Sequence, residues 1–190
     1  MKMGIEIKGI NEALEMLNPR IHSEIVKNAI NDTAKQTKEY AVNTIVSRYN
    51  INKSNVNIPL DKAVLTDLSA KLHLSRRPID LIKLGKAIWQ RVWTAARVEV
   101  KKGSGRKNVT DKKPNAFIAI MPKTGHTGVF MRIGTYIKGQ RQQIQQEVGP
   151  SIEQMFKKNI KWFEDFASKT LLSNMTEQVR AMIIKKGSLK

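Results

Sequence analysis

Small and apolar side chains recur every three or four residues between Pro19 and Tyr49, a spacing that places them on one face of an α-helix. Pro19 suits the first turn of this helix, because the N–H group that proline lacks would have no helical acceptor there. The residues on this face are Val26, Ile30, Ala34, Thr37, Ala41, Ile45 and Tyr49. We therefore predict a long helix over this segment. A short strand at residues 4–8 and a brief helix that includes Leu14 and Leu17 are expected before it.

Alternation of apolar and polar residues predicts several strands further along the chain. Such alternation runs through residues 68–74 and again through residues 92–100. Residues 116–121 form an apolar run that is too short for an independent helix, and residues 128–133 supply another strand. We expect 92–100 and 116–121 to pair as a hairpin, so that a meander of three or four antiparallel strands results.

The C-terminal third changes to a helical pattern. Ser151 followed by Gln154 is typical of a capping box, in which each side chain binds the backbone N–H of the other residue. Apolar residues then follow at helical spacing, and a second helical stretch is expected from about Ser168. One turn of helix is also expected at residues 53–56.

The order of these elements predicts the fold class. Helices flank the strands on both sides in sequence and no strand–helix–strand repeat occurs, which indicates an α+β fold. We expect a single domain over residues 1–190, with the long N-terminal helix packed on a small antiparallel sheet of about three to five strands. A C-terminal helical segment is predicted at about residues 150–187.

Positive charge is abundant and concentrated in one region. The 190 residues include 34 Lys and Arg against 16 Asp and Glu, a formal net charge of +18. Such a field attracts nucleic acid, anionic lipid or an acidic protein surface. Residues 86–143 hold 13 of the basic residues but only two acidic ones, Glu99 and Asp111. Most of the net charge therefore belongs to less than a third of the chain.

The densest part of this region runs from Lys101 to Lys113, with six cations, one anion and two glycines. This composition predicts a mobile cationic loop that closes the 92–121 hairpin. The cations are denser than solubility requires, so we favour contact with phosphate or an acidic protein over a purely solubilising turn. No aromatic residue lies between them, which argues against base stacking and favours contact with a nucleic-acid backbone. The candidate contact residues are Lys101, Lys102, Arg106, Lys107, Lys112 and Lys113.

Residues that could support catalysis or bind a metal are scattered. The chain has no cysteine, and its histidines lie far apart in different predicted elements. Glu164 and Asp165 are adjacent on a predicted helix and therefore point in different directions. We predict no enzymatic activity, no metal site and no cofactor. The three histidines are His22, His73 and His126.

Membrane association is not expected. No apolar run approaches the ~20 residues of a bilayer span. The apolar stretch at the N-terminus is also too short and too broken for a signal peptide. We expect a soluble protein made in a cytoplasm, without a membrane partner.

Two motifs resemble one known family in order and spacing. Residues 125–132 (GHTGVFMR) are similar to the H-x-G-V-F-x-R strand of the prophage minor tail protein Z family, the lambda-like tail completion or neck proteins. Residues 149–156 (GPSIEQMF) resemble the G-P-S-[IV]-x-x-M-[FL] stretch that begins the family's C-terminal helices. The N-terminal plan and residues 77–82 (RPIDLI) are also similar, so the resemblance extends over nearly the whole chain.

The motif residues divide into expected scaffold and expected contact positions. We interpret Gly128 and Gly149 as turn residues and the apolar motif residues as core. His126 and Arg132 are the expected interface residues. The full set of motif positions is His126, Gly128, Phe130, Arg132, Gly149, Pro150, Met155 and Phe156.

The resemblance implies a structural protein of a tailed phage or prophage virion, located where the tail joins the neck and present in the host cytoplasm during assembly. It further implies a homo-oligomeric ring, expected to be a hexamer, that surrounds the DNA channel. Neighbouring neck and tail-terminator proteins and the genomic DNA would be its partners. The net charge alone also allows a sequence-independent DNA-binding protein outside the virion. A nuclease using Glu99 or Asp111 has less support.

Overall fold

A computed structural model describes residues 19–84, 97–109, 116–134, 137–139 and 142–187. The strand predicted at residues 4–8 and the brief helix after it lie outside the described residues. The chain divides into two compact units. The first, the helical unit, comprises residues 1–42, 58–74 and 156–190, and the second, the sheet unit, comprises residues 43–57 and 75–155.

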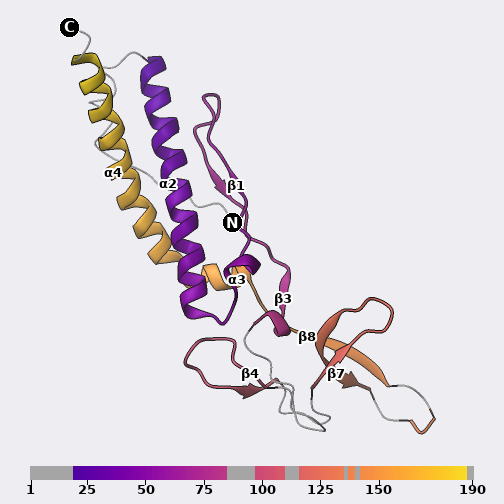
Figure 1. Cartoon of the computed structure of the whole chain (residues 1–190). Helices are drawn as coiled ribbons and strands as arrows, with labels where there is room; N and C mark the ends of the chain where they lie inside the picture. The colour runs from indigo at the N-terminus through magenta and orange to yellow at the C-terminus, as the bar shows by residue number, and fades with distance from the viewer. Residues whose placement is uncertain (1–18, 85–96, 110–115, 135–136, 140–141, 188–190) are drawn as a thin grey trace. The chain divides into compact units, whose positions relative to one another are not determined.

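The predicted long helix is confirmed as α2, Pro19–Arg48. In the helical unit it packs against α4, Ile160–Gly187 (Figure 1). At one level of this contact, the Tyr40 ring stacks on Phe166 with 4.2 Å between ring centroids and meets Phe163 edge-on at 5.9 Å. At another level the buried residues are Ala29, Leu171 and Met175, with Val26, Ile30 and Val179 packed around them.

A polar cluster lies within this largely apolar contact. The Asn174 side-chain amide donates to Thr33 Oγ1 at 3.0 Å, and Thr33 in turn donates to the Ala29 carbonyl at 2.7 Å. Gln36 Nε2 lies 3.5 Å from Asn174 Oδ1. A one-turn slip of α4 along α2 would leave these buried polar groups unpaired, so the cluster fixes the register of the two helices.

A second contact of α2 within the helical unit is with a small hairpin. Strands β1, Leu60–Asp61, and β2, Lys71–Leu72, pair in antiparallel fashion. The Asn31 side chain donates to the Ala63 carbonyl at 3.1 Å and accepts from the Ala63 N–H at 2.7 Å, so it binds the hairpin as a neighbouring strand would. The prediction of a strand over residues 68–74 is wrong in extent, because Leu68 is exposed and only residues 71–72 pair.

The sheet unit contains a four-stranded antiparallel sheet in the order β3-β8-β7-β6. A separate pair of strands forms a second hairpin. The bounds of the four-stranded sheet are β3 Pro78–Asp80, β6 Phe117–Ile120, β7 Thr127–Ile133 and β8 Gln143–Ser151. The second hairpin is β4 Arg97–Val98 with β5 Lys107–Asn108. Short 3-10 helices occur at η1, Lys53–Asn55, as predicted, and at η2, Leu81–Lys83.

One predicted strand pairing is wrong. The strand at 116–121 does not pair with the strand ending at residue 100. Instead β6 pairs with β7, with Phe117 opposite Phe130, and β4 pairs with β5. The short connection between β6 and β7 makes this pairing local in sequence, whereas the predicted hairpin would have needed a much longer loop. Residues 92–96 of the predicted strand lie outside the described residues.

The predicted capping box is confirmed at the start of α3, Ile152–Lys157. The Ser151 N–H donates to Gln154 Oε1 at 3.0 Å, and the Gln154 N–H donates to Ser151 Oγ at 3.2 Å. The helix stops before Asn159, and α4 begins at Ile160, earlier than the Ser168 start that the apolar spacing predicted. A long helix, antiparallel sheets of two to four strands and C-terminal helices together confirm the α+β class.

The interpretation of the two motif glycines as turn residues is wrong. Gly128 lies within β7 and Gly149 within β8, and neither has a positive φ. A Cβ atom on Gly149 would overlap Leu84 Cδ1, and Leu84 is fully buried. Glycine is therefore required at residue 149 because another side chain occupies the space of its missing Cβ.

We predict that Gly149→Ala destabilises the protein by about 1–3 kcal/mol through overpacking against Leu84. Leu84→Ala alone should cost about 2–5 kcal/mol, because it leaves a cavity. The added methyl group fills part of that cavity, so the double variant should be less destabilised than the sum of the single variants. Urea unfolding of the four proteins measures this coupling, and strictly additive losses would contradict the contact.

Candidate polyanion-binding site

The most basic described segment is residues 97–109, here called the basic hairpin. In its two strands Arg97 lies opposite Asn108 and Val98 opposite Lys107. Arg97 Nε donates to Asn108 Oδ1 at 3.0 Å across the pair. The loop predicted over residues 101–113 is therefore shorter in the structure, since Lys107 and Asn108 form a paired strand. Lys112 and Lys113 lie outside the described residues.

Internal hydrogen bonds close the turn of the basic hairpin. Ser104 donates to the Lys101 carbonyl from both its backbone N–H, at 3.2 Å, and its hydroxyl, at 2.7 Å. Gly103 and Gly105 have φ of 76° and 69°, backbone conformations that glycine adopts without steric cost. The Gly105 N–H donates to Glu99 Oε1 at 3.2 Å. The acidic residue of the hairpin thus supports its turn.

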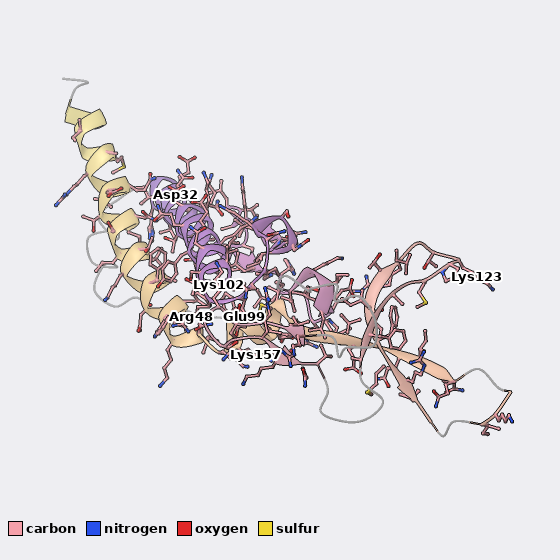
Figure 2. All side chains as sticks on the ribbon, turned by 60° about the horizontal axis from the view of Figure 1, so that its bottom comes forward. Asp32, Arg48, Glu99, Lys102, Lys123 and Lys157 are labelled. Carbon is pink, nitrogen blue, oxygen red and sulfur yellow. The ribbon has the colours of Figure 1, made fainter. Side chains whose placement is uncertain are left out.

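Main-chain hydrogen bonds anchor the basic hairpin to the chain that leaves α2. The Lys102 N–H donates to the Arg48 carbonyl at 3.0 Å, and the Asn50 N–H donates to the Val100 carbonyl at 3.0 Å. The Asn50 side chain adds a 2.8 Å bond to the Glu99 carbonyl. Figure 2 shows Arg48, Glu99 and Lys102 in one region of the unit. The cations therefore project from a segment fixed by its backbone.

The cationic side chains of the basic hairpin are exposed and form no ion pair within the described part of the chain. Lys101, Lys102, Arg106 and Lys107 are exposed, and none of them forms an ion pair there. Some cations elsewhere in the same unit are paired: Arg76 lies 3.1 Å from Glu153, and Lys83 lies 3.3 Å from Asp80. The charges of the basic hairpin are instead available for an external anion.

The two units differ in charge. The sheet unit holds 18 basic and 5 acidic residues, a net charge of +13. The helical unit holds 16 basic and 11 acidic residues, a net charge of +5, all of which comes from residues 156–190. The field that attracts polyanions is therefore mainly that of the unit that contains the basic hairpin.

The first family-like motif forms a row along one face of the four-stranded sheet. Alternate residues of a strand share a face, so Gly128, Phe130 and Arg132 of β7 lie on the same side, and His126, directly before the strand, contacts Phe130. The His126 and Phe130 rings meet edge to face at 6.4 Å on either side of Gly128, whose Cβ would lie 3.1 Å from the Phe130 ring. The Arg132 guanidinium lies 4.7 Å from the centre of the Phe117 ring, a cation–π arrangement.

This geometry separates scaffold from surface among the motif residues. Phe130, Met155 and Phe156 are buried, which confirms their predicted core role. Arg132 is exposed, whereas His126 Nε2 is buried and has no hydrogen-bond partner among the described residues. Pro150 is half-buried in β8. The row belongs to the four-stranded sheet and the basic hairpin to a different sheet, so the structure gives two separate candidate contact surfaces.

The candidate residues for hydrolysis do not come together. His22 lies in α2, and His73 hydrogen-bonds Asp61 across the β1–β2 hairpin. Glu99 supports the basic hairpin turn, and Asp111 lies outside the described residues. No group of three potential metal ligands occurs in the part of the chain that the structure describes. No helix there is long and apolar enough to span a bilayer.

Sequence reasoning missed two contributors to the basic site. Arg97 extends the cationic surface along β4, and Asn50 fixes the hairpin from 49 residues earlier in the chain. Arg97 could have been found from its place in the alternating segment 92–100, which predicted a strand that leads into the basic residues. Nothing local in the sequence indicates that Asn50 hydrogen-bonds to the basic hairpin. Comparison with protein-family models, curated proteins and solved structures gave no match.

We predict that alkaline pH weakens the anchor of the basic hairpin. Tyr49, which bridges to Lys101, is buried, and this burial raises its pKa above the usual value near 10 while Arg48 offsets only part of the effect. The unfolded chain releases this proton first, so the stability that the protonated phenol provides is present below pH 10 and is lost as pH rises above it. Urea unfolding at about pH 8 and about pH 11 gives the free energy of unfolding at each pH. This free energy should fall less between the two pH values for Tyr49→Phe than for the wild type. Equal losses would contradict this role.

Proposed function

We propose that this chain is a structural subunit of a tailed phage or prophage particle at the tail–neck junction. In this role, copies form a ring around the DNA channel, complete the tail and help to join it to the head. The observation that carries the proposal is the anchored basic hairpin, whose exposed cations form no ion pair among the described residues. The resemblance of residues 125–132 and 149–156 to the tail completion family supplies the particle context.

The charge of the basic hairpin suits a DNA conduit. Duplex DNA carries one phosphate charge per ~1.7 Å of axis, so a ring ~35 Å thick encloses about 20 phosphates. Each basic hairpin has five cations and one anion over residues 97–108. Six copies would therefore bring about 24 net positive charges to the channel, which matches the phosphates they would face. Contacts of this kind hold the backbone without reading base sequence.

The remaining positive charge exceeds what the enclosed DNA can neutralise, since each copy carries +18 in total. An acidic surface on a neighbouring neck or tail-terminator protein is the second partner that we propose. Arg132 suits this contact, because the Phe117 ring holds its exposed guanidinium in place and little side-chain entropy is lost on binding a carboxylate.

The same basic hairpin also favours a second function, that of a sequence-independent DNA-binding protein acting outside the virion. The two functions differ in the number of basic hairpins that must bind the same DNA molecule at once. A free binder holds duplex DNA as a monomer with a steep salt dependence, whereas a channel subunit binds weakly until a ring brings several hairpins together.

We predict that replacing Lys101, Lys102, Arg106 and Lys107 by Ser weakens binding to a short duplex and lowers the slope of log K against log salt. The four lost phosphate contacts reduce the slope by up to about 3.6 per bound copy. Stability should change little, since all four side chains are exposed. Fluorescence anisotropy across a salt series measures the slope, and particle infectivity should fall with it.

The matched control removes the same number of charges from the helical unit, at four exposed positions away from the basic hairpin. If this control variant lost as much affinity and as much salt slope as the hairpin variant, net charge rather than the basic hairpin would be responsible for binding. The four substitutions are Lys35→Ser, Lys158→Ser, Lys161→Ser and Arg180→Ser.

A further inference from the structure

The helical unit has two different flanks. The β1–β2 hairpin binds α2 through Asn31, and α4 binds α2 through Thr33. Two residues along an α-helix rotate the side-chain direction by about 200°, so these partners lie on opposite sides of α2. Figure 1 shows the same order, with α2 between α4 and the hairpin that contains β1.

The tip of the β1–β2 hairpin is apolar, exposed and well formed. Val64, Leu65 and Leu68 expose 52%, 48% and 39% of their surface. Two backbone hydrogen bonds between Val64 and Asp67, of 2.9 and 3.1 Å, close the turn. An ordered turn that presents three large apolar side chains to water is an unusual surface for a monomer, and it marks a contact site.

The opposite flank offers a complementary surface on α4. Leu171 and Met175 belong to the buried cluster against α2, whereas Leu172, a residue between them in sequence, exposes 51% of its surface. Charge is complementary as well: residues 58–70 carry a net charge of −1, and residues 156–190 carry +5. Exposed Lys169 lies one turn before Leu172 on the same helix.

We infer that the β1–β2 hairpin tip of one copy binds the outer face of α4 around Leu172 in a second copy of this chain. This inference rests on the proposed ring, which requires one head-to-tail contact made by two different patches of the same subunit. A second copy is the occupant because copies of a +18 protein repel each other and can meet most easily where one side of the contact is apolar and slightly acidic. The hairpin tip, with a net charge of −1 over residues 58–70, is such a surface, and the basic α4 segment of the second copy complements it.

The salt dependence of assembly separates this contact from DNA binding. The overall repulsion between two +18 copies outweighs the attraction between residues 58–70, at −1, and residues 156–190, at +5. Added salt screens this repulsion and leaves apolar burial intact, so self-association should strengthen with salt while binding to duplex DNA weakens. Sedimentation velocity of the full chain across a salt series measures self-association directly. Leu65→Ser and Leu172→Ser should each weaken it at least about tenfold, whereas Ile120→Thr, at an exposed apolar residue of the sheet unit, should leave it unchanged.

Mixing the two variants gives the sharpest test of a head-to-tail contact. The Leu65→Ser protein keeps an intact α4 face, and the Leu172→Ser protein keeps an intact hairpin tip. Each alone should be monomeric, and an equimolar mixture should form dimers that do not grow further, because only one of the two possible contacts remains intact. Urea unfolding of both variants should match the wild type, since both side chains are exposed.

The possible failures are distinguishable. Wild-type multimers that survive both substitutions would overturn this contact and leave the proposed ring standing. If only the Ile120→Thr variant lost self-association, the contact between copies would lie at the edge of the four-stranded sheet, and the inference would be overturned. A wild-type chain that stays monomeric at every salt concentration, with and without duplex DNA, would overturn both the contact and the ring. Normal self-association of a Leu65→Ser protein that fails to enter particles would assign the tip to a different neck protein and overturn the inference.

Discussion

The basic hairpin is held in place by a hydrogen bond to the Arg48 carbonyl and by hydrogen bonds that the backbone and side chain of Asn50 donate, and the proposed function depends on this anchor. Exposed cations on a freely moving segment could spread apart and reduce their repulsion. Here the turn is closed by Ser104 and the strands are paired, so the positive charges stay close together whether or not an anion is present. A preorganised cluster of this kind favours a polyanion, because binding it relieves repulsion with little loss of conformational entropy.

The uneven division of charge explains how one small chain could both bind DNA and assemble with itself. The sheet unit carries +13 and supplies the cationic surface, whereas residues 1–42 and 58–74 of the helical unit carry no net charge. The Thr33–Asn174 hydrogen bond sets the register of α2 and α4, and Asn31 sets the position of the β1–β2 hairpin. These polar contacts place the two apolar patches at fixed positions on opposite flanks, as a repeating contact between copies requires.

Local patterns in the sequence predicted the elements that local physics controls. The apolar period predicted α2, the Ser151–Gln154 spacing predicted the capping box, and the basic composition located the candidate site. Pairing between distant segments was not predictable in this way. Strand β8 was missed because Gln143 and Gln145 are polar and exposed, and its identity as a strand comes from its partners β7 and β3. Likewise, only the packing of Leu84 shows why residue 149 is glycine.

We propose that the basic hairpin of this chain faces DNA within a ring at the neck of a particle. A cryo-EM map of the tail–neck region of virions assembled with this protein would decide this. Such a map should show density for a ring of these subunits, with residues 97–108 of every copy directed at the DNA in the channel. A channel lined entirely by other proteins, or a ring whose basic hairpins point away from the DNA, would overturn the proposal.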